Sequence, residues 1–307
     1  MGDILKGKVA IVTGSGRGIG RAHAIAMAAQ GARVVVNDPG VNLEGIGSDK
    51  GPADEVVAEI RKSGGEAVAN YDSVATSKGA ANIIKTAMDN FGRLDILVNN
   101  AGIFGLGTWI WDISDEEFDK MIKTHVYGHF YCAREAANIF RKQNSGRIIN
   151  TSSTAGLGWH YTTAKDPRDT HYGTAKEALV GLTRTLAHEM ENFGVTVNCI
   201  RPGATTRLAR TFVTPKLAKQ IGKEEAERRF AAMLQQSPPE ACSALVVFLA
   251  SDAASNVNGC IFYVEGGEVS IYRDPPYKAG TVWKDGIWTL EELMQLLPKT
   301  ITAGKGS

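Results

Sequence analysis

The chain has 307 residues, of which 43% are hydrophobic and 22% are charged, and its formal net charge is +1. This composition is typical of a folded globular protein. A charge near zero without a basic run gives no electrostatic basis for binding nucleic acid or an anionic membrane, so we expect neither partner. The N-terminus lacks a charged stretch followed by an apolar one, and no run approaches the roughly 20 apolar residues of a membrane span, so a cytoplasmic protein is expected.

Short apolar segments rich in β-branched residues alternate with longer amphipathic segments. The predicted strands are Val9–Thr13, Arg33–Asn37, Ala67–Tyr71, Ile96–Asn99, Arg147–Thr151, Thr196–Ile200 and Ile261–Val264. The predicted helices begin at Gly18, Pro52, Ser77, Ser114, His171 and Pro239. Such alternation, with right-handed crossovers, predicts a doubly wound (Rossmann) α/β fold in which a parallel seven-stranded sheet has helices on both faces.

We expect a single domain over residues 1–269 and a C-terminal extension over residues 270–307. In the extension, Thr289–Glu292 has the pattern of a capping box and predicts a short helix that docks on the domain or on a neighbouring subunit. Three connections, 39–51, 153–170 and 201–238, are long for this fold. Long loops at the carboxyl ends of parallel strands are where ligands bind.

A glycine-rich segment joins the first predicted strand to the first predicted helix. Glycines allow a tight turn and a close approach of the backbone to a pyrophosphate, and the N–H groups and dipole at the start of a helix stabilise the negative charge. This context favours a dinucleotide-binding loop over a glycine turn without a ligand. The cofactor-binding residues expected here are Gly14, Arg17, Gly18, Ile19 and Gly20.

Asp38 ends the second predicted strand about 20 residues after the glycines, where a carboxylate accepts hydrogen bonds from ribose hydroxyls and repels a 2′-phosphate. Arg17 in the loop favours that phosphate instead, but Asp38 is expected to be the nearer group, so NAD is preferred over NADP. Asp72, with Ser73 beside it, follows the third strand and is expected at the adenine end of the cofactor. The alternative for Asp72 is that it caps the next helix.

Tyr172 and Lys176 lie four residues apart at the start of a long predicted helix, so both side chains point to one place. A neighbouring cation favours the phenolate, and we expect it to lower the pKa of Tyr172 and make the phenol an acid and base usable near neutral pH. Ser153, after the fifth predicted strand, is placed to donate to a substrate oxygen.

Five ordered motifs resemble those of the classical short-chain dehydrogenase/reductase family over about residues 5 to 267. The motifs are Thr13–Gly20, Asn99–Gly102, Ser153, the pair Tyr172 and Lys176, and Pro202–Gly203. The resemblance implies that Tyr172 donates and accepts the proton, that Lys176 holds the nicotinamide ribose and lowers the tyrosine pKa, and that Ser153 orients the substrate.

The same resemblance places three more cofactor-binding residues beside the cofactor, Asn100, Ala101 and Gly102, and gives Asn99 a partly structural role. It also places Pro202 and Gly203 behind the nicotinamide. Within the family, the segments around Asp38, Ala67–Val74 and His125 resemble the (3R)-hydroxyacyl-CoA dehydrogenase unit of peroxisomal multifunctional enzymes. From this resemblance we infer a common family and not a common substrate.

A second Tyr-x-x-x-Lys pattern, Tyr161 and Lys165, competes with the first. It precedes Asp166–Asp169, which includes a proline and breaks any helix, so Tyr172 is preferred. His125 stands where most family members have an asparagine of the proton relay, and it is either a relay residue or a satisfied core histidine. His129 lies one turn further, but no third ligand accompanies the pair, so no metal site is expected.

These observations predict an NAD-dependent short-chain alcohol dehydrogenase or ketoreductase with Ser153, Tyr172, Lys176 and His125 as catalytic residues. Its substrate is expected to be a small alcohol or ketone such as a hydroxyacyl-CoA, a hydroxysteroid or another apolar alcohol. The alternative is a non-catalytic NAD(H)-binding sensor or scaffold on the same fold. Family members are usually dimers or tetramers, so a homodimer or homotetramer is expected.

Overall fold

The structure is a computed structural model that describes residues 2–42, 45–104, 108–158, 169–206, 214, 215 and 217–272, with isolated positions between 283 and 300. The chain divides into two units, Met1–Tyr272 and Arg273–Ser307. The helix predicted around Thr289–Glu292 falls largely outside the described residues. Within the described part of the chain, no helix is long and apolar enough to cross a membrane.

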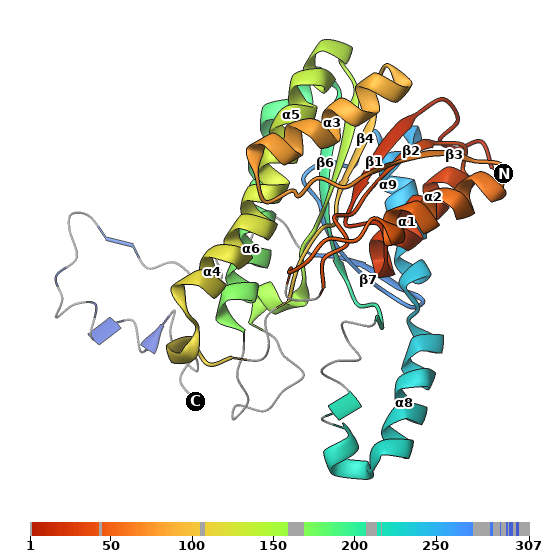
Figure 1. The fold of residues 1–307 in the computed structure, drawn as a ribbon. Helices are drawn as coiled ribbons and strands as arrows, with labels where there is room; N and C mark the ends of the chain where they lie inside the picture. The colour runs from red at the N-terminus through yellow and green to blue at the C-terminus, as the bar shows by residue number, and fades with distance from the viewer. Residues whose placement is uncertain are drawn as a thin grey trace. The chain divides into compact units, whose positions relative to one another are not determined.

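A sheet of eight strands in the order β3-β2-β1-β4-β5-β6-β7-β8 forms the centre of the first unit (Figure 1). The strands are β1 (Val9–Thr13), β2 (Arg33–Asn37), β3 (Glu66–Asn70), β4 (Ile96–Asn99), β5 (Gly146–Thr151), β6 (Val195–Pro202), β7 (Ile261–Glu265) and β8 (Glu268–Ile271). The strands β1 to β7 are parallel, and β8 is antiparallel to β7. The doubly wound α/β fold is therefore confirmed, with an added eighth strand that we did not predict.

Helices cover both faces of the sheet, and the apolar core forms two layers, one on each face (Figure 1). One layer contains side chains of α1 (Gly18–Ala29), α2 (Gly51–Lys62) and α9 (Ser243–Ala250). The other contains side chains of α3 (Ser77–Phe91), α5 (Gly128–Gln143) and α6 (Thr170–Met190). Every residue of β1 is buried as a result, which explains why its sequence is a continuous apolar run and does not alternate.

The remaining helices lie in the connections. α4 (Asp115–Ile122) follows β4, and α8 (Lys223–Gln236) lies in the long connection between β6 and β7. α4 begins with a capping box of Ser114 and Glu117, in which both reciprocal hydrogen bonds are present, at the position where we predicted a helix to begin. Between α4 and α5 the helix widens into one π-helical turn, η2 (Lys123–Tyr127).

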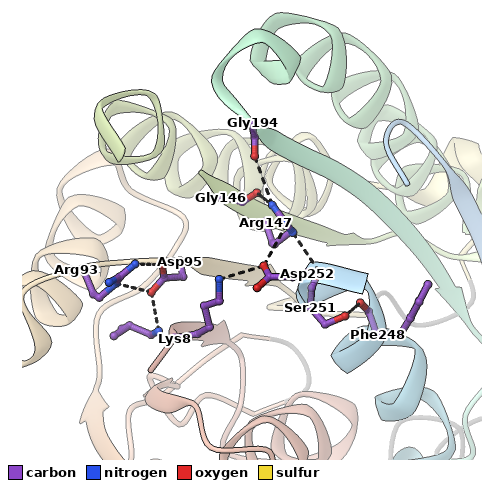
Figure 2. A network of polar contacts seen from close by, with 10 residues as sticks. Lys8, Arg93, Asp95, Gly146, Arg147, Gly194, Phe248, Ser251 and Asp252 are labelled. Atoms are coloured by element: carbon purple, nitrogen blue, oxygen red, sulfur yellow. Dashed lines mark hydrogen bonds and ion pairs between the residues drawn. The ribbon is translucent and has the colours of Figure 1, made fainter. Parts of the chain in front are cut away.

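Asp95 anchors the amino ends of β1 and β4 (Figure 2). Its side chain is almost fully buried, and Oδ2 accepts the backbone N–H of Val9 at 2.9 Å. Arg93 donates two hydrogen bonds to the same carboxylate, at 2.9 and 2.6 Å. A buried carboxylate is stable only when it is paired in this way.

Arg147, in β5, ties the neighbouring segments together at the same end of the sheet (Figure 2). Its buried guanidinium lies 3.5 Å from Asp252, which also accepts from Lys8 at 3.1 Å. The guanidinium donates to the backbone carbonyls of Gly146, Gly194 and Ser251.

We expect Asp95→Ala to lower the free energy of unfolding by about 3 kcal/mol, because the buried Val9 amide and the Arg93 cation would lose their partner. The measurement is urea unfolding followed by circular dichroism. The matched control is Asp89→Ala, which breaks an exposed pair with Lys85 one helical turn away and should cost under about 0.5 kcal/mol. Equal losses in the two variants would contradict this interpretation.

Candidate active site

The predicted site residues lie at or after the carboxyl ends of β1 to β6. In a doubly wound sheet these ends form a crevice where the strand order reverses, here between β1 and β4. The sheet thereby gathers segments that are up to about 190 residues apart, from the glycine loop after β1 to Gly203 after β6. The structure places one group of side chains around Tyr172 and another around the glycine loop.

The glycines of the loop after β1 serve different purposes. Gly14 has a φ of +63°, and an added Cβ would lie 2.7 Å from the Cα of Ala101. An added Cβ on Gly20 would lie 2.3 Å from the carbonyl oxygen of Gly14. Gly18 has a φ of +55°, and an added Cβ would meet Thr206 at 3.9 Å, an ordinary contact distance. Gly14 and Gly20 are thus required for packing, and Gly18 for its left-handed backbone.

The start of α1 is suited to an anion. Arg17, the residue before the helix, is extended and forms no side-chain cap, and Ile19 and Gly20 follow in the first turn. The first N–H groups of a helix have no partner within the helix, and the helix dipole favours a negative charge there. A pyrophosphate therefore fits this loop, as the sequence pattern predicts.

Asp38 lies directly against the glycine loop. Its Oδ2 accepts the backbone N–H of Gly16 at 2.8 Å, and its Oδ1 accepts the N–H of Gly40 at 2.7 Å. An added Cβ on Gly16 would lie 2.8 Å from the same carboxylate oxygen. The negative charge is consequently held beside the loop in a defined orientation.

Asp72 does not cap the helix that follows it. Thr76 does so, because its side chain accepts the N–H of Gly79. The Asp72 carboxylate instead accepts the side-chain amides of Asn70 at 2.9 Å and Asn82 at 3.0 Å. Ser73 bonds locally, with its hydroxyl accepting the N–H of Ala75 at 3.2 Å. The capping alternative for Asp72 is therefore wrong.

The segment after β4 is fixed to the end of β1. The Asn100 side chain donates to the carbonyls of Thr13 at 2.9 Å and Gly14 at 3.1 Å. Ala101 packs against Gly14, and Gly102 against the His125 ring, where an added Cβ would lie 2.5 Å from Cε1. The segment 100–102 thus supports the glycine loop on one side and the catalytic candidates on the other.

The segment after β6 is equally tight. Pro202 is the last residue of β6, and the Gly203 N–H donates to the carbonyl of Val264 at 2.8 Å. An added Cβ on Gly203 would lie 2.8 Å from the carboxyl carbon of Glu265. Only glycine permits this approach.

Ser153, Tyr172 and Lys176 meet after β5 and at the start of α6. The Tyr172 hydroxyl forms a hydrogen bond with the Ser153 side chain. The Lys176 ammonium lies 5.6 Å from the centre of the Tyr172 ring and donates to the carbonyl of Thr151 at 2.8 Å. The structure therefore brings together three of the four side chains that we predicted to be catalytic.

Burial controls the acid–base properties of this group. It raises the pKa of Tyr172 to about 12, helped by the carboxylate of Asp169 and opposed by the Ser153 hydrogen bond. Burial also lowers the pKa of Lys176 to about 8. The expectation that Lys176 lowers the tyrosine pKa is wrong for the chain by itself, because removing water from the phenolate outweighs other influences.

His125 is the fourth predicted side chain, and it lies edge-on to Tyr172 with the ring centres 5.6 Å apart. It belongs to the π-helical turn, a feature often found at functional sites. Its Nε2 lies 2.8 Å from the carbonyl of Ile103, while its buried Nδ1 has no partner in the described part of the chain. Burial and the nearby Lys176 hold the His125 pKa well below its ordinary value, so the ring is neutral.

Two residues of this group were missed by sequence reasoning. Asp169 precedes α6 with a left-handed φ of +49°, is buried, and accepts the N–H of Thr108 at 3.2 Å. The sequence pattern indicates Asp169 only as part of the helix-breaking segment Asp166–Asp169, although an aspartate directly before a helix is itself a signal. Arg201, buried in β6, donates to the carbonyl of Ser153 at 3.0 Å.

The competing pair, Tyr161 and Lys165, lies outside the described residues. Of the aromatic side chains, Phe104 contacts Tyr172 with the ring centres 4.7 Å apart. Trp109 and Trp111 stack on each other at 5.0 Å. Phe104 is therefore placed to contribute an apolar wall beside the candidate catalytic group.

A doubly wound sheet with an uncapped glycine loop and a Ser-Tyr-Lys group defines a dinucleotide-binding protein of the oxidoreductase class. The profile of the family described as enoyl-(acyl carrier protein) reductase matches residues 14–268. The chain belongs to the short-chain dehydrogenase/reductase family, whose members are oxidoreductases that bind a nicotinamide cofactor.

Individual relatives agree with this assignment. A Mycobacterium tuberculosis protein named as a short-chain type dehydrogenase/reductase is 41% identical over 85% of this chain and 83% of its own length. Peroxisomal multifunctional enzyme type 2 of Mus musculus is 39% identical over 87% of this chain, which spans only 33% of the mouse enzyme.

Solved structures give the same result. A short chain dehydrogenase from Mycobacterium avium has a TM-score of 0.78 and 41% identity, and the match covers 97% of this chain and 95% of that one. A 7α-hydroxysteroid dehydrogenase complexed with NADH and 7-oxoglycochenodeoxycholic acid has a TM-score of 0.71 and 31% identity, with 86% and 94% covered.

The buried Lys176 predicts a pH dependence of stability in the cofactor-free protein. Its pKa is about 8 in the folded state and 10.5 in the unfolded chain, so between these values the unfolded state binds more protons. The free energy of unfolding should rise by about 3 kcal/mol from pH 8 to pH 10.5, measured relative to Lys176→Met by urea unfolding. For Lys85→Met, a change at an exposed lysine, the free energy of unfolding should depend on pH as it does in the wild type. The same pH dependence in Lys176→Met and the wild type would contradict the lowered pKa of Lys176.

Proposed function

We propose that the protein is an NAD-dependent oxidoreductase that interconverts a secondary alcohol and a ketone, with Tyr172 as proton donor and acceptor. The observation that supports this most directly is the hydrogen bond between the Tyr172 hydroxyl and Ser153, one helical turn from Lys176. Bound nicotinamide supplies or accepts the hydride. The chain itself has to hold the substrate oxygen and move one proton.

Each side chain of the group has a distinct task. Tyr172 faces Ser153, so a substrate oxygen placed between them accepts or donates through both hydroxyls. Lys176 is held by the carbonyl of Thr151, and its pKa of about 8 lets it exchange a proton near neutral pH. The neutral His125 directs Nε2 at the Ile103 carbonyl, which leaves Nδ1 as an acceptor beside Tyr172 and supports a role in relaying the proton.

A non-catalytic sensor or scaffold is the competing function. Such a protein needs the cofactor loop and would have no use for a buried lysine beside a hydrogen-bonded tyrosine and serine. Burying an ammonium costs free energy unless it is paired, and Lys176 is held by one carbonyl oxygen. Retention of this costly arrangement favours the enzyme.

We expect Tyr172→Phe to lower kcat by about 10³-fold, because the proton donor is lost while the ring still packs against Phe104. NADH binding, followed by fluorescence, should change little. The control is Tyr161→Phe, which should retain full turnover. Full turnover in Tyr172→Phe, or its loss in Tyr161→Phe, would contradict the assignment of Tyr172.

The position of Asp38 favours NAD over NADP. The carboxylate is held 2.8 Å from the Gly16 amide, so a 2′-phosphate brought to the glycine loop would meet a fixed negative charge. Arg17 lies one residue further along the loop. It directly precedes α1, and its side chain forms no cap hydrogen bond there.

Asp38→Asn removes this charge with little change in size. The ratio of kcat/KM for NADP to that for NAD should rise at least about tenfold, because like-charge repulsion is removed. Asp49→Asn is the matched control, since its exposed carboxylate bonds locally to the Gly51 amide. An unchanged ratio in Asp38→Asn would show that another group selects the cofactor.

The first substrate class to test is a 3-hydroxyacyl or 3-oxoacyl thioester. Support comes from the relatives, which include peroxisomal hydratase-dehydrogenase-epimerases and a 3-oxoacyl-[acyl-carrier-protein] reductase of Synechocystis. A hydroxysteroid is the second class, supported by the steroid dehydrogenase structure with 31% identity. Phe104 beside Tyr172 suits the apolar part of either substrate.

A homodimer or homotetramer stays a prediction. Its support is an exposed aromatic face at the start of α5, where the side chains of Tyr127 and Phe130 are each 44% exposed. Arg134 lies over the rings of Phe130 and Tyr131 on the same face. Aromatic side chains with arginine are typical of subunit contacts.

A further inference from the structure

Arg201 is a buried cation beneath the candidate active site, and none of the roles proposed above uses it. It is the seventh residue of β6, directly before Pro202. Only 3% of its side chain is exposed. A charge buried this deeply is costly unless hydrogen bonds and an opposite charge compensate it, and removing its partners is strongly destabilising.

The guanidinium contacts both segments that form the Ser153 and Tyr172 pair. Nη1 donates to the carbonyl of Ser153 at 3.0 Å, and Nη2 donates to Glu177 at 2.8 Å. Glu177 is the residue after Lys176 on α6. One side chain therefore joins the loop after β5 to the helix that presents Tyr172 and Lys176.

These two segments already pack closely, so small movements matter. An added Cβ on Gly156 would lie 2.5 Å from the Glu177 carboxylate, and one on Gly173 would lie 3.0 Å from the Ala155 carbonyl. The Ser153 carbonyl also accepts the N–H of Gly156 at 3.2 Å. The Ser153 carbonyl thus accepts two hydrogen bonds, one from Gly156 within the turn and one from Arg201.

Besides Ser153 and Glu177, Arg201 contacts Tyr272, the residue after β8. The ring of Tyr272 lies under the guanidinium, 5.0 Å from its carbon to the ring centre. The remaining donor, Nε, is buried and has no partner among the residues that the structure describes. The cation is held by one carboxylate, one carbonyl and one aromatic face.

We propose that Arg201 is a positioning residue of the active site: it fixes the Ser153 carbonyl and, through Glu177, the first turns of α6, and so keeps the Ser153 and Tyr172 hydroxyls in contact. The inference rests on the proposed function for its catalytic consequence. Its structural part, the anchoring of the Ser153 loop, is measurable without any substrate.

Arg147 offers a matched control. It is also a buried arginine, it lies on the neighbouring strand β5, and it too donates to backbone carbonyls. Its partners Gly146 and Gly194 lie at the amino ends of β5 and β6, whereas Ser153 follows the carboxyl end of β5. Arg147→Met and Arg201→Met therefore remove the same chemical group at comparable burial, near and far from the site.

The first measurement is hydrogen exchange of the full chain, read on the peptide that contains residues 153–158. In Arg201→Met, the amides of Ala155 and Gly156 should exchange at least about tenfold faster, because their acceptor residue Ser153 loses its anchor. Arg147→Met should leave this peptide unchanged. Equal exchange in the two variants would overturn the inference.

The second measurement is turnover of acetoacetyl-CoA with NADH at equal folded fraction. Arg201→Met should lower kcat at least about tenfold relative to Arg147→Met, because displaced catalytic groups lose their alignment. NADH affinity should fall by a smaller factor than kcat, since the hydrogen bonds of Arg201 go to Ser153 and Glu177 and not to the glycine loop. In the reverse direction, with 3-hydroxybutyryl-CoA and NAD, the apparent pKa of the rate profile should rise, because the Ser153 bond lowers the Tyr172 pKa.

Arg201→Lys keeps the charge but replaces the planar guanidinium with a single ammonium nitrogen, so it should fall between the wild type and Arg201→Met in both measurements. It also serves if Arg201→Met does not fold. Faster exchange with turnover equal to that of Arg147→Met would overturn the positioning role. If the wild type does not turn over acetoacetyl-CoA, the proposed substrate class fails, and the exchange comparison decides the inference by itself.

Discussion

Polar groups are buried at the carboxyl edge of the sheet, and each has to find a partner inside the protein. Thr13 illustrates this at the end of β1, because its hydroxyl accepts the N–H groups of both Asn100 and Ala101 at 3.0 Å. Deeper in, Asn99 donates to Asn150, which donates to Thr183 of α6. Satisfying these groups fixes the loops that present the cofactor and the substrate, so the site is a consequence of the hydrogen bonding that the fold requires.

The same removal of water sets the charge state of the catalytic candidates. The pKa of Tyr172 rises and that of Lys176 falls, and both changes favour the neutral form. The pair is therefore a phenol beside an amine that loses its proton easily, and not a fixed phenolate beside a fixed ammonium. Two neighbouring groups adjust this balance: the hydrogen bond with Ser153 lowers the pKa of Tyr172, and the negative charge of Asp169 raises it.

Local patterns allowed the fold and most of the site to be predicted. The runs of β1 and β2 and the start of a helix at Ser114 depend on neighbouring residues, and their predicted positions are confirmed. β8 was missed although the Gly266–Gly267 pair before it is a hairpin signal. The contacts of Arg201 and the Tyr172 pKa could not be predicted, because they depend on burial and on contacts between residues up to 71 apart in sequence. The π-helical turn at His125 has no sequence pattern that we recognise.

The antiparallel strand at the end of the sheet also affects solubility. All four residues of β8 are exposed, including Val269 and Ile271 at 57% and 61%. An apolar edge strand is a template on which other chains can add and aggregate. β8 is short and begins with a charged residue, Glu268, and both features oppose such growth. Replacing Glu268 with an apolar residue would therefore remove the charge that opposes pairing at this edge and favour aggregation through β8.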